Sequence, residues 1–212
     1  MKLVSTPRVE FLRALATEIL HNYSRGRTTV AVDGAPDTVR EAFADDLARV
    51  LDERGQPSFR ASLRYFQRSR HEQEVFGGPS PQRHYRFDYD YSALRRVLIE
   101  PFRMGGSTGF VTRHFDPDRD SWIEPNWLTA PPDATLVVDG EFVNRPELRG
   151  LWSYSVWLEG ATRNADGAGH LEYGQLEEDV LYRAESNPRS AASVVVDLTD
   201  PTVPRRQFLD SC

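Results

Sequence analysis

The sequence predicts an α/β protein built in three layers, with a mostly parallel sheet between two layers of helices. Three apolar, β-branched runs carry this prediction, at 28–33 (TTVAVD), 134–139 (ATLVVD) and 192–197 (ASVVVD). Because none of these runs alternates apolar with polar residues, each is expected to be buried on both faces, as strands of parallel sheets are. Helical patterns lie between the runs, and this alternation of strand and helix is typical of a doubly wound fold.

The chain opens with a predicted helix, strand and second helix. Residues 7–22 begin with a proline and place apolar residues at helical spacing, which predicts an amphipathic helix. The strand at 28–33 stops at Gly34, and a second helical pattern covers 36–53. A strand, a glycine turn and a helix form the opening unit of a doubly wound fold.

The rest of the chain predicts fewer regular elements, namely a strand at 59–63, a helix at 92–100, a strand at 153–158 and a helix at 173–185. The segment 64–90 is rich in Arg, Tyr, Gly and Pro, so it is predicted as a long functional loop rather than a core element. A hairpin is expected around 110–115, and Trp122 and Trp127 are expected to serve mainly in core packing. The whole of 1–212 is predicted to form one domain.

Composition narrows the class of protein. Lys and Arg total 26 against 32 Asp and Glu, a net charge of −6, which argues against non-specific binding to nucleic acid or anionic membranes. The single cysteine, Cys212, and five histidines without metal-ligand spacing predict no metal site. No signal-peptide core or long apolar run is present, so a cytoplasmic location is expected.

Five stretches, in order, resemble uridine kinase-like proteins of the P-loop nucleoside kinase superfamily, from about residue 8 to 206. They are VAVDGAPDTVREAFADDLARVLDERG (30–55), FRASLRYFQRSR (59–70), HYRFDYDYSALRRVLIEPFRMGG (84–106), TLVVDGEFVNRPELRGLWSYSVWLE (135–159) and NPRSAASVVVDLTDPTVP (187–204). The resemblance implies a three-layer P-loop kinase-like fold, with ATP and Mg²⁺ as the family's cofactors. It also implies a substrate loop at 64–90 and a lid at 160–175, which looks reduced in this sequence.

The first stretch stands where such kinases carry the motif G-x-x-x-x-G-K-[ST]. The glycines of that motif let backbone amides close on the phosphates, the lysine neutralises their charge and the hydroxyl binds Mg²⁺. Here Gly34 is kept, but Val39 replaces the second glycine, Arg40 the lysine and Glu41 the hydroxyl. A β-branched side chain, a forked cation and a carboxylate all work against phosphate binding. The plainer interpretation is that 34–41 is only a turn between a strand and a helix.

In the family the catalytic aspartate follows the second strand and accepts the proton of the substrate hydroxyl. The matching positions hold Arg64 and Tyr65. Arginine cannot accept a proton at neutral pH, and tyrosine does so only with a pKa lowered by cationic neighbours. Asp139 stands where the family supports its metal, although it could equally cap a turn. The candidate catalytic residues are therefore Arg64, Tyr65 and Asp139.

The polar and aromatic side chains of 64–90 suit a pocket for a small polar or anionic ligand. Together with the altered loop and the reduced lid they supply the ligand-binding candidates Arg40, Glu41, Arg68, Arg70, His71, His84, Tyr85, Glu141 and Arg163.

Three functions are open at this point. The first is a pseudokinase that keeps the scaffold and binds a small polar or anionic ligand. The second is an enzyme of another reaction class that needs no ATP. The third is an active nucleoside or small-molecule kinase with a non-standard P-loop, the only one of the three with ATP and Mg²⁺ as cofactors. Phosphoryl transfer depends on positioning and electrostatics, so several concerted losses favour the first two. A homodimer is compatible with the sequence.

Overall fold

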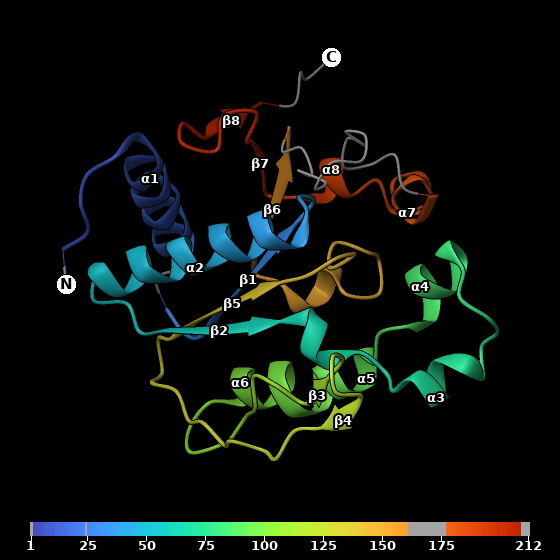
Figure 1. The fold of residues 1–212 in the computed structure, drawn as a ribbon. Helices are drawn as coiled ribbons and strands as arrows, with labels where there is room; N and C mark the ends of the chain where they lie inside the picture. Colours follow the sequence, from blue (N-terminus) through green and yellow to red (C-terminus); the bar gives the residue numbers. More distant parts are fainter. Residues whose placement is uncertain (1, 24, 161–176, 209–212) are drawn as a thin grey trace.

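The computed structural model describes residues 2–23, 25–160 and 177–208 (Figure 1). It confirms the predicted α/β architecture, because a six-stranded sheet lies between helices on both faces. In spatial order the strands are β2 (Ser58–Ser62), β5 (Thr135–Asp139), β1 (Thr28–Asp33), β6 (Tyr154–Glu159), β7 (Val194–Asp197) and β8 (Arg205–Gln207). The first five run parallel, whereas β8, an element that the sequence pattern did not predict, pairs antiparallel with β7.

The register of the parallel strands brings three chain segments together at one edge of the sheet. Asp139, the last residue of β5, lies opposite Ser62 of β2 and opposite Val32 of β1. Carboxyl ends of parallel strands are where α/β proteins bind their ligands. The turns that follow β1, β2 and β5 therefore define the region in which a site is expected.

Helices α1 (Pro7–Asn22) and α2 (Asp37–Glu53) cover one face of the sheet (Figure 1). Thr6 caps α1 by accepting a hydrogen bond from the amide of Val9 at 3.2 Å, and Pro7 occupies the first turn, as the cap-and-proline pattern predicts. The core between the helices and the sheet includes Leu12, Ile19, Phe43, Leu47, Val30, Val32 and Val156, all without exposed surface. This packing holds the first turn of α2 beside the end of β1.

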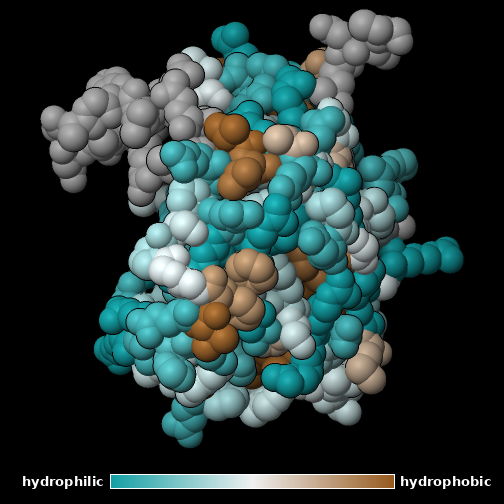
Figure 2. All heavy atoms as spheres, turned by 90° about the vertical axis from the view of Figure 1, so that its right-hand side faces the viewer, coloured by the Kyte–Doolittle hydropathy of each residue, from teal (hydrophilic) through white to brown (hydrophobic). Residues whose placement is uncertain are grey.

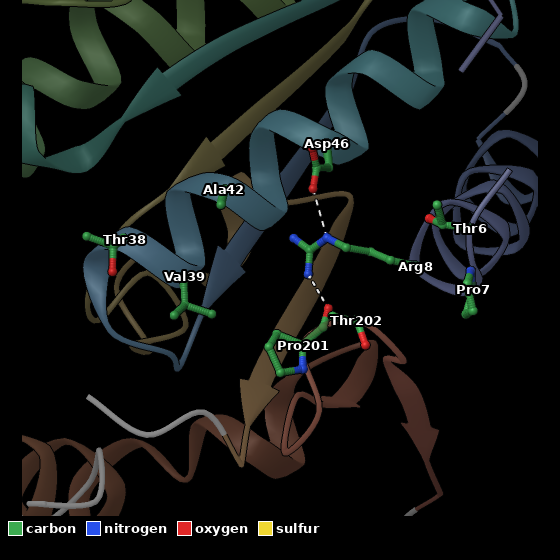
Figure 3. Close-up of a pocket in the computed structure, with 9 residues that line it drawn as sticks. All are labelled: Thr6, Pro7, Arg8, Thr38, Val39, Ala42, Asp46, Pro201 and Thr202. Carbon is green, nitrogen blue, oxygen red and sulfur yellow. Dashed lines mark hydrogen bonds and ion pairs between the residues drawn. The ribbon is translucent and has the colours of Figure 1, made fainter. Parts of the chain in front are cut away.

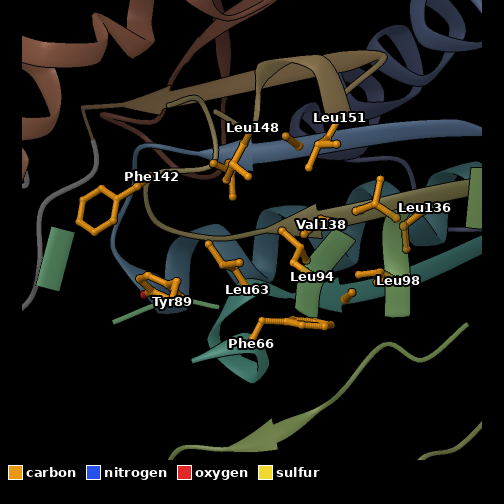
Figure 4. Close-up of a cluster of buried hydrophobic side chains, with 14 of the residues drawn as sticks. Leu63, Phe66, Tyr89, Leu94, Leu98, Leu136, Val138, Phe142, Leu148 and Leu151 are labelled. Atoms are coloured by element: carbon orange, nitrogen blue, oxygen red, sulfur yellow. The ribbon is translucent and has the colours of Figure 1, made fainter. Parts of the chain in front are cut away.

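A continuous helical stretch covers the opposite face. It consists of α5 (Tyr91–Ala93), a π-helical segment η2 (Leu94–Ile99) and α6 (Glu100–Met104). Figure 4 shows the side chains of Leu94 and Leu98 packed with Leu136 and Val138 of β5 and with Phe66. The sequence predicted a helix only over 92–100, and the structure extends it at both ends.

The prediction that 64–90 is a loop without a core role was wrong. It holds a 3₁₀ turn η1 (Leu63–Phe66) and two short helices, α3 (Arg70–Glu74) and α4 (Pro81–Phe87). Ser69 and Glu72 form a capping box at the start of α3, and Ser80 caps α4. Phe66, Tyr85 and Tyr89 from this segment are buried in the hydrophobic core. The segment shows little helical periodicity, but capping side chains and the burial of aromatic residues stabilise its short helices.

The segment 103–133 also departs from expectation. The hairpin pairs β3 (Phe115–Asp116) with β4 (Ser121–Trp122), so it turns at 117–120 rather than around 110–115. Phe110 instead bridges to Leu128. Trp122 and Trp127 are 59% and 61% exposed, so the expectation that they pack in the core was wrong.

Three further helical elements are η3 (Arg149–Leu151), which precedes β6, and α7 (Glu177–Ser186) and α8 (Pro188–Ala191), which lie between β6 and β7. Helix α7 covers most of the helix expected at 173–185, whose first residues lie outside the described ranges. The proposed lid at 160–175 likewise lies outside them, apart from Gly160. Within the described ranges no helix has the length and apolar character needed to cross a membrane.

Apolar side chains on the face viewed in Figure 2 are gathered in small, separate patches among hydrophilic ones. One exposed pair consists of Phe76 and Phe87, whose rings stack at 4.6 Å, with the guanidinium of Arg68 5.6 Å from the Phe76 ring. This contact packs the residues that flank α3 against the end of α4 at the surface.

Gly34 is predicted to be intolerant of substitution. Its φ of +101° disfavours any residue with a Cβ, and a Cβ built there would meet the carbonyl oxygen of Leu158. We expect Gly34→Ala to lower the free energy of unfolding by about 3 kcal/mol, combining backbone strain with overpacking. Gly55→Ala is the control, because Gly55 has φ +77° but a Cβ added there would have no atom within 4 Å. It should cost about 1 kcal/mol. Equal losses in urea denaturation would contradict the steric argument.

Candidate functional site

The candidate site lies where β1, β2 and β5 end, and its central group is the carboxylate of Asp139. This side chain is fully buried. Arg60 Nη2 donates to Asp139 Oδ1 at 2.7 Å, and the Ser62 hydroxyl donates to Oδ2 at 3.0 Å. Arg40 Nε lies 3.9 Å from Oδ2. A buried carboxylate is tolerated only with such opposite charges and hydrogen bonds, so both arginines are needed to compensate the charge of Asp139.

Arg60 is a charged residue in the middle of β2, and the sequence analysis did not select it. Besides Asp139, its guanidinium donates to Asp45 Oδ1 at 2.8 Å and to the carbonyl oxygens of Ala61 and Val137 at 2.9 Å each. Arg60 therefore links α2, β2 and β5 and has its donors engaged. An arginine inside a predicted strand of a doubly wound sheet is a sequence signal that could have marked this residue.

Arg40, the residue at the motif's lysine position, is 4% exposed and turns back onto its own loop. Nη1 donates to the carbonyl oxygen of Ala35 at 2.8 Å, and Nη2 donates to Asp37 Oδ1 at 2.6 Å. Helix α2 already begins at Asp37. The amides of Val39 and Arg40 donate to the carbonyl oxygen of Pro36 at 3.0 and 2.9 Å. The backbone here is wound into the first turn of the helix.

Asp33, at the end of β1, anchors the other side of this loop and was not selected from the sequence. Its fully buried carboxylate accepts hydrogen bonds from the amide of Gly34 at 2.8 Å, the amide of Asn144 at 3.1 Å and the hydroxyl of Tyr182 at 2.5 Å. Burial raises the pKa of Asp33, and the hydrogen bond from Tyr182 and the charge of Arg40 oppose that rise. Asp33 thus ties the loop to the segment after β5 and to α7.

A polar cavity of about 250 Å³ opens between α2, the end of β2 and the segment before β3. We call it the polar cavity, and it is lined by Glu41, Asp45, Arg60, Ala61, Ser62, Tyr65, Thr112 and Arg113. The structure therefore brings together Glu41 and Tyr65, two of the residues predicted from sequence. Arg113 and Thr112 were missed, because 103–133 shows no periodicity that would place them.

Glu41 and Tyr65 meet different neighbours in the polar cavity. Burial raises the pKa of Glu41, and the nearby carboxylates of Asp139 and Asp37 raise it further, while Arg64 and Arg40 oppose the change. The guanidinium carbon of Arg113 lies 3.9 Å from the centroid of the Tyr65 ring. Tyr65 is thus covered on one face by a cation.

Arg64 does not line the polar cavity. Its Nη2 lies 2.6 Å from both carboxylate oxygens of Asp118. This ion pair joins η1 to the turn between β3 and β4.

His84 and Glu141 form a second cluster close to the loop, which we call the histidine cluster, with Asp88 and Tyr89. His84 Nδ1 lies 3.1 Å from Asp88 Oδ2, and Nε2 lies 2.9 Å from Glu141 Oε2. The hydroxyl of Tyr89 donates to the same Glu141 oxygen at 3.3 Å. Both ring nitrogens therefore face carboxylates, which favours the imidazolium form.

The charges of the histidine cluster follow from these contacts. Burial alone would lower the pKa of His84, but the hydrogen bonds to Asp88 and Glu141 outweigh it and raise the pKa to about 10. Burial would raise the pKa of Glu141, but the hydrogen bond from His84 and the charge of Arg40 lower it to about 2. At neutral pH the cluster is a charged link between α4 and the end of β5.

The other candidates lie apart from the polar cavity. Tyr85 is 2% exposed in the core, with its hydroxyl 3.0 Å from Ser186 Oγ. Arg68 Nε donates to the carbonyl oxygen of Phe87 at 3.0 Å. Arg70 and His71 are exposed on α3. Arg163 lies outside the described residues.

A larger cavity of about 670 Å³ lies on the other side of the loop, between the first turns of α1 and α2 and the segment after β7 (Figure 3). Arg8 reaches from α1 across it, donating to Asp46 Oδ2 at 2.8 Å and to the carbonyl oxygen of Pro201 at 2.9 Å. Figure 3 shows Val39 and Ala42 on its α2 side. Its two charged side chains are paired with each other, so it offers a polar ligand less than the polar cavity does.

Within residues 2–23, 25–160 and 177–208, no three His, Cys, Asp or Glu side chains gather closely enough to hold a metal ion.

In comparisons with known proteins, no family model and no curated protein matches this sequence. Solved structures do match. A protein described as a possible uridine kinase from Bacillus stearothermophilus matches with TM-score 0.70 at 20% identity, over 89% of this chain and 96% of that chain. A candidate fructose transport system kinase from a Silicibacter species gives TM-score 0.59 at 20% identity, over 85% and 91%. D-glycerate 3-kinase from Cryptococcus neoformans gives 0.53 at 9% identity, over 94% and 99%.

At such low identities the likeness shows the fold alone. The fold is that of P-loop kinases of the uridine and glycerate kinase type, as the sequence resemblance implied.

Arg60 is predicted to be coupled to Asp139. We expect Arg60→Met to lower the free energy of unfolding by about 2 kcal/mol, because it leaves a buried carboxylate short of its closest cation. In the double variant with Asp139→Asn the loss should be at least about 1 kcal/mol smaller than the sum of the two single losses. Strictly additive losses of unfolding free energy in a urea double-mutant cycle would show that the contact between Arg60 and Asp139 does not contribute to stability.

The histidine cluster predicts a pH-dependent contribution to stability. The folded-state pKa of His84, about 10, lies above the ordinary 6.5, so its contribution is complete below about pH 6.5 and is lost as the pH rises to about 10. The stability difference between the natural protein and His84→Gln should therefore shrink over that range in urea denaturation. His71→Gln, at an exposed histidine, is the control. A His84→Gln difference that stays constant with pH would contradict the assigned charges.

Proposed function

We propose that the protein binds a small polar or anionic ligand in the polar cavity and does not perform ordinary ATP-dependent phosphoryl transfer. The observation that carries this proposal is the state of the loop after β1. The cation at the motif's lysine position, Arg40, donates to Ala35 and Asp37 of the same loop. A cation whose hydrogen bonds are donated to its own loop is not available to bind a phosphate.

The residues of the loop fit neither ATP nor Mg²⁺. Phosphate binding needs backbone amides that face the ligand, but those of Val39 and Arg40 donate to Pro36. The metal needs a hydroxyl at the position of Glu41, whose carboxylate faces the polar cavity instead. Asp139, the expected support of the metal, is bonded to Arg60 and Ser62.

The position of the family's catalytic base supports the same proposal. Arg64 is paired with Asp118, and Tyr65 lies beneath the guanidinium of Arg113. Neither side chain is a carboxylate that could accept the proton of a substrate hydroxyl.

Ligand binding is favoured over a purely protein-binding role. The polar cavity retains charged and hydroxyl groups at its walls, as sites for small polar molecules do. On the face seen in Figure 2 the apolar patches are small and separate, whereas stable protein interfaces are built around larger apolar areas. The proposal places this ligand, rather than nucleic acid or a membrane, as the protein's partner in the cytoplasm, and it leaves a homodimer open.

The second candidate is an active kinase with a non-standard P-loop. It is favoured by the three matching structures, each described as a kinase, and by the presence of Asp139 and Gly140 at the end of β5. An ATP-independent enzyme is the third, because Glu41 is a cavity-lining carboxyl group whose raised pKa suits acid–base chemistry.

Isothermal titration with ATP–Mg²⁺ separates these functions. We expect no binding by the natural protein, because Arg40 and the first turn of α2 occupy the phosphate site. The variant with Val39→Gly, Arg40→Lys and Glu41→Ser restores the motif and is expected to bind. Arg49→Lys, the same exchange at an exposed position of α2, should leave the natural result unchanged. Micromolar binding by the natural protein would overturn the proposal and place the kinase first.

A further inference from the structure

The chemistry of the ligand can be inferred from which polar groups of the polar cavity lack hydrogen-bond partners. Most of these groups already bond to other residues, and a few do not. The donors of Arg60 are engaged by Asp45, Asp139 and two backbone carbonyl oxygens. Ser62 donates to Asp139. These residues form the fixed frame of the cavity and contribute little free hydrogen-bonding capacity.

Glu41 is the carboxylate in the cavity wall that remains available to a ligand. It is half-buried, and its carboxylate makes no hydrogen bond or ion pair with any residue in the described part of the chain. A partly desolvated carboxylate without a partner is unfavourable, and a cation or hydrogen-bond donor placed beside it would relieve that cost. The raised pKa of Glu41 reflects the same environment.

Arg113 is the cation in the cavity wall that remains available to a ligand. Arg113 is exposed, and its guanidinium carbon lies 3.9 Å from the centroid of the Tyr65 ring. Among the described residues it forms no ion pair and donates no hydrogen bond. Stacking orients a guanidinium while leaving its edge N–H donors open to a carboxylate or another anion. Arg64, by contrast, is already occupied by Asp118.

The hydroxyls of Tyr65 and Thr112 complete the set of polar groups that stay unbonded within the described residues. The cavity volume of about 250 Å³ corresponds to roughly eight water molecules at about 30 Å³ each. It is smaller than the roughly 300–1,000 Å³ of pockets for drug-sized ligands. A molecule of amino-acid size fits this volume.

We propose that the polar cavity binds a small zwitterion of the amino-acid class, with its ammonium group on Glu41 and its carboxylate on Arg113. This inference rests on the proposed function, because it names the class of the small polar ligand. A zwitterion pairs both unpartnered charges at once, whereas a purely anionic ligand would leave Glu41 unpaired and beside a like charge. The Tyr65 and Thr112 hydroxyls are then left for a polar side chain of the ligand.

The test titrates the full-length chain with free α-amino acids and their ω-amino homologues, by thermal shift and then by calorimetry. Each binder is compared with its N-acetyl derivative, which lacks the cation, and its amide, which lacks the anion. Both derivatives should bind about tenfold or more weakly, as expected for the loss of a charge-assisted hydrogen bond. Small neutral polyols and inorganic phosphate serve as the other ligand classes.

Two variants assign the charges to residues. Glu41→Gln should abolish the preference for the free amine over the N-acetyl form and keep the preference for the free carboxylate. Arg113→Gln should do the reverse. Glu124→Gln and Arg119→Gln, at exposed positions outside the cavity lining, are the matched controls and should change neither preference. Unfolding of each variant without ligand verifies that it is folded.

The outcomes separate this inference from the proposed function. If a polyol or phosphate binds in the cavity and no zwitterion does, the zwitterion inference is wrong and the proposed function stands. If amino acids bind but neither variant changes their preferences, the assignment to Glu41 and Arg113 is overturned. If no ligand of any class binds, both proposals fail.

Discussion

The buried carboxylate of Asp139 is the constraint on which the rest of the site depends. It stands at the end of β5 and is fully buried, so cations from neighbouring elements must balance its charge. Arg60 supplies one from β2 and Arg40 approaches from α2. The same two arginines then bind Asp45 and Asp37 of α2, so a single buried charge fastens the helix to two strands.

This arrangement has opposite consequences on the two sides of α2. On the loop side it commits Arg40 to internal partners rather than to a ligand. On the β2 side it commits Arg60 and Asp45 to each other, so that among the described charged groups lining the polar cavity Glu41 and Arg113 remain available to a ligand. One network thereby links the two halves of the proposed function, a loop that does not bind phosphate and a cavity that binds a small polar ligand.

Much of the fold could be predicted from the sequence. The β-branched runs ending in Asp33 and Asp139 are buried strands because apolar residues continue on both faces. Since the two strands are parallel, their carboxyl ends lie at the same edge of the sheet. The segment 64–90, which was wrongly predicted as a loop, does contain a sequence pattern that marks the start of a helix, because Ser69 and Glu72 have capping-box spacing. It was outweighed by a composition that is typical of loops.

The site itself was predicted only in part. Arg40, Glu41, Tyr65 and Asp139 were selected, because a family motif marks their positions. The partners that decide their roles were not selected. Arg113 comes from an aperiodic segment, whereas Arg60, a charged residue inside a predicted strand, carried a signal that was not used. Sequence spacing carries no information on which way a side chain such as Arg40 turns.

The central claim is that Arg40 fills its own loop and excludes a triphosphate. A crystal structure of the natural protein grown in excess ATP–Mg²⁺ tests it most directly. We expect the Arg40 guanidinium within hydrogen-bond distance of the Ala35 carbonyl oxygen and the Asp37 carboxylate, with no triphosphate in the loop. A triphosphate bound by the loop amides, with Arg40 swung outward onto its phosphates, would contradict the account.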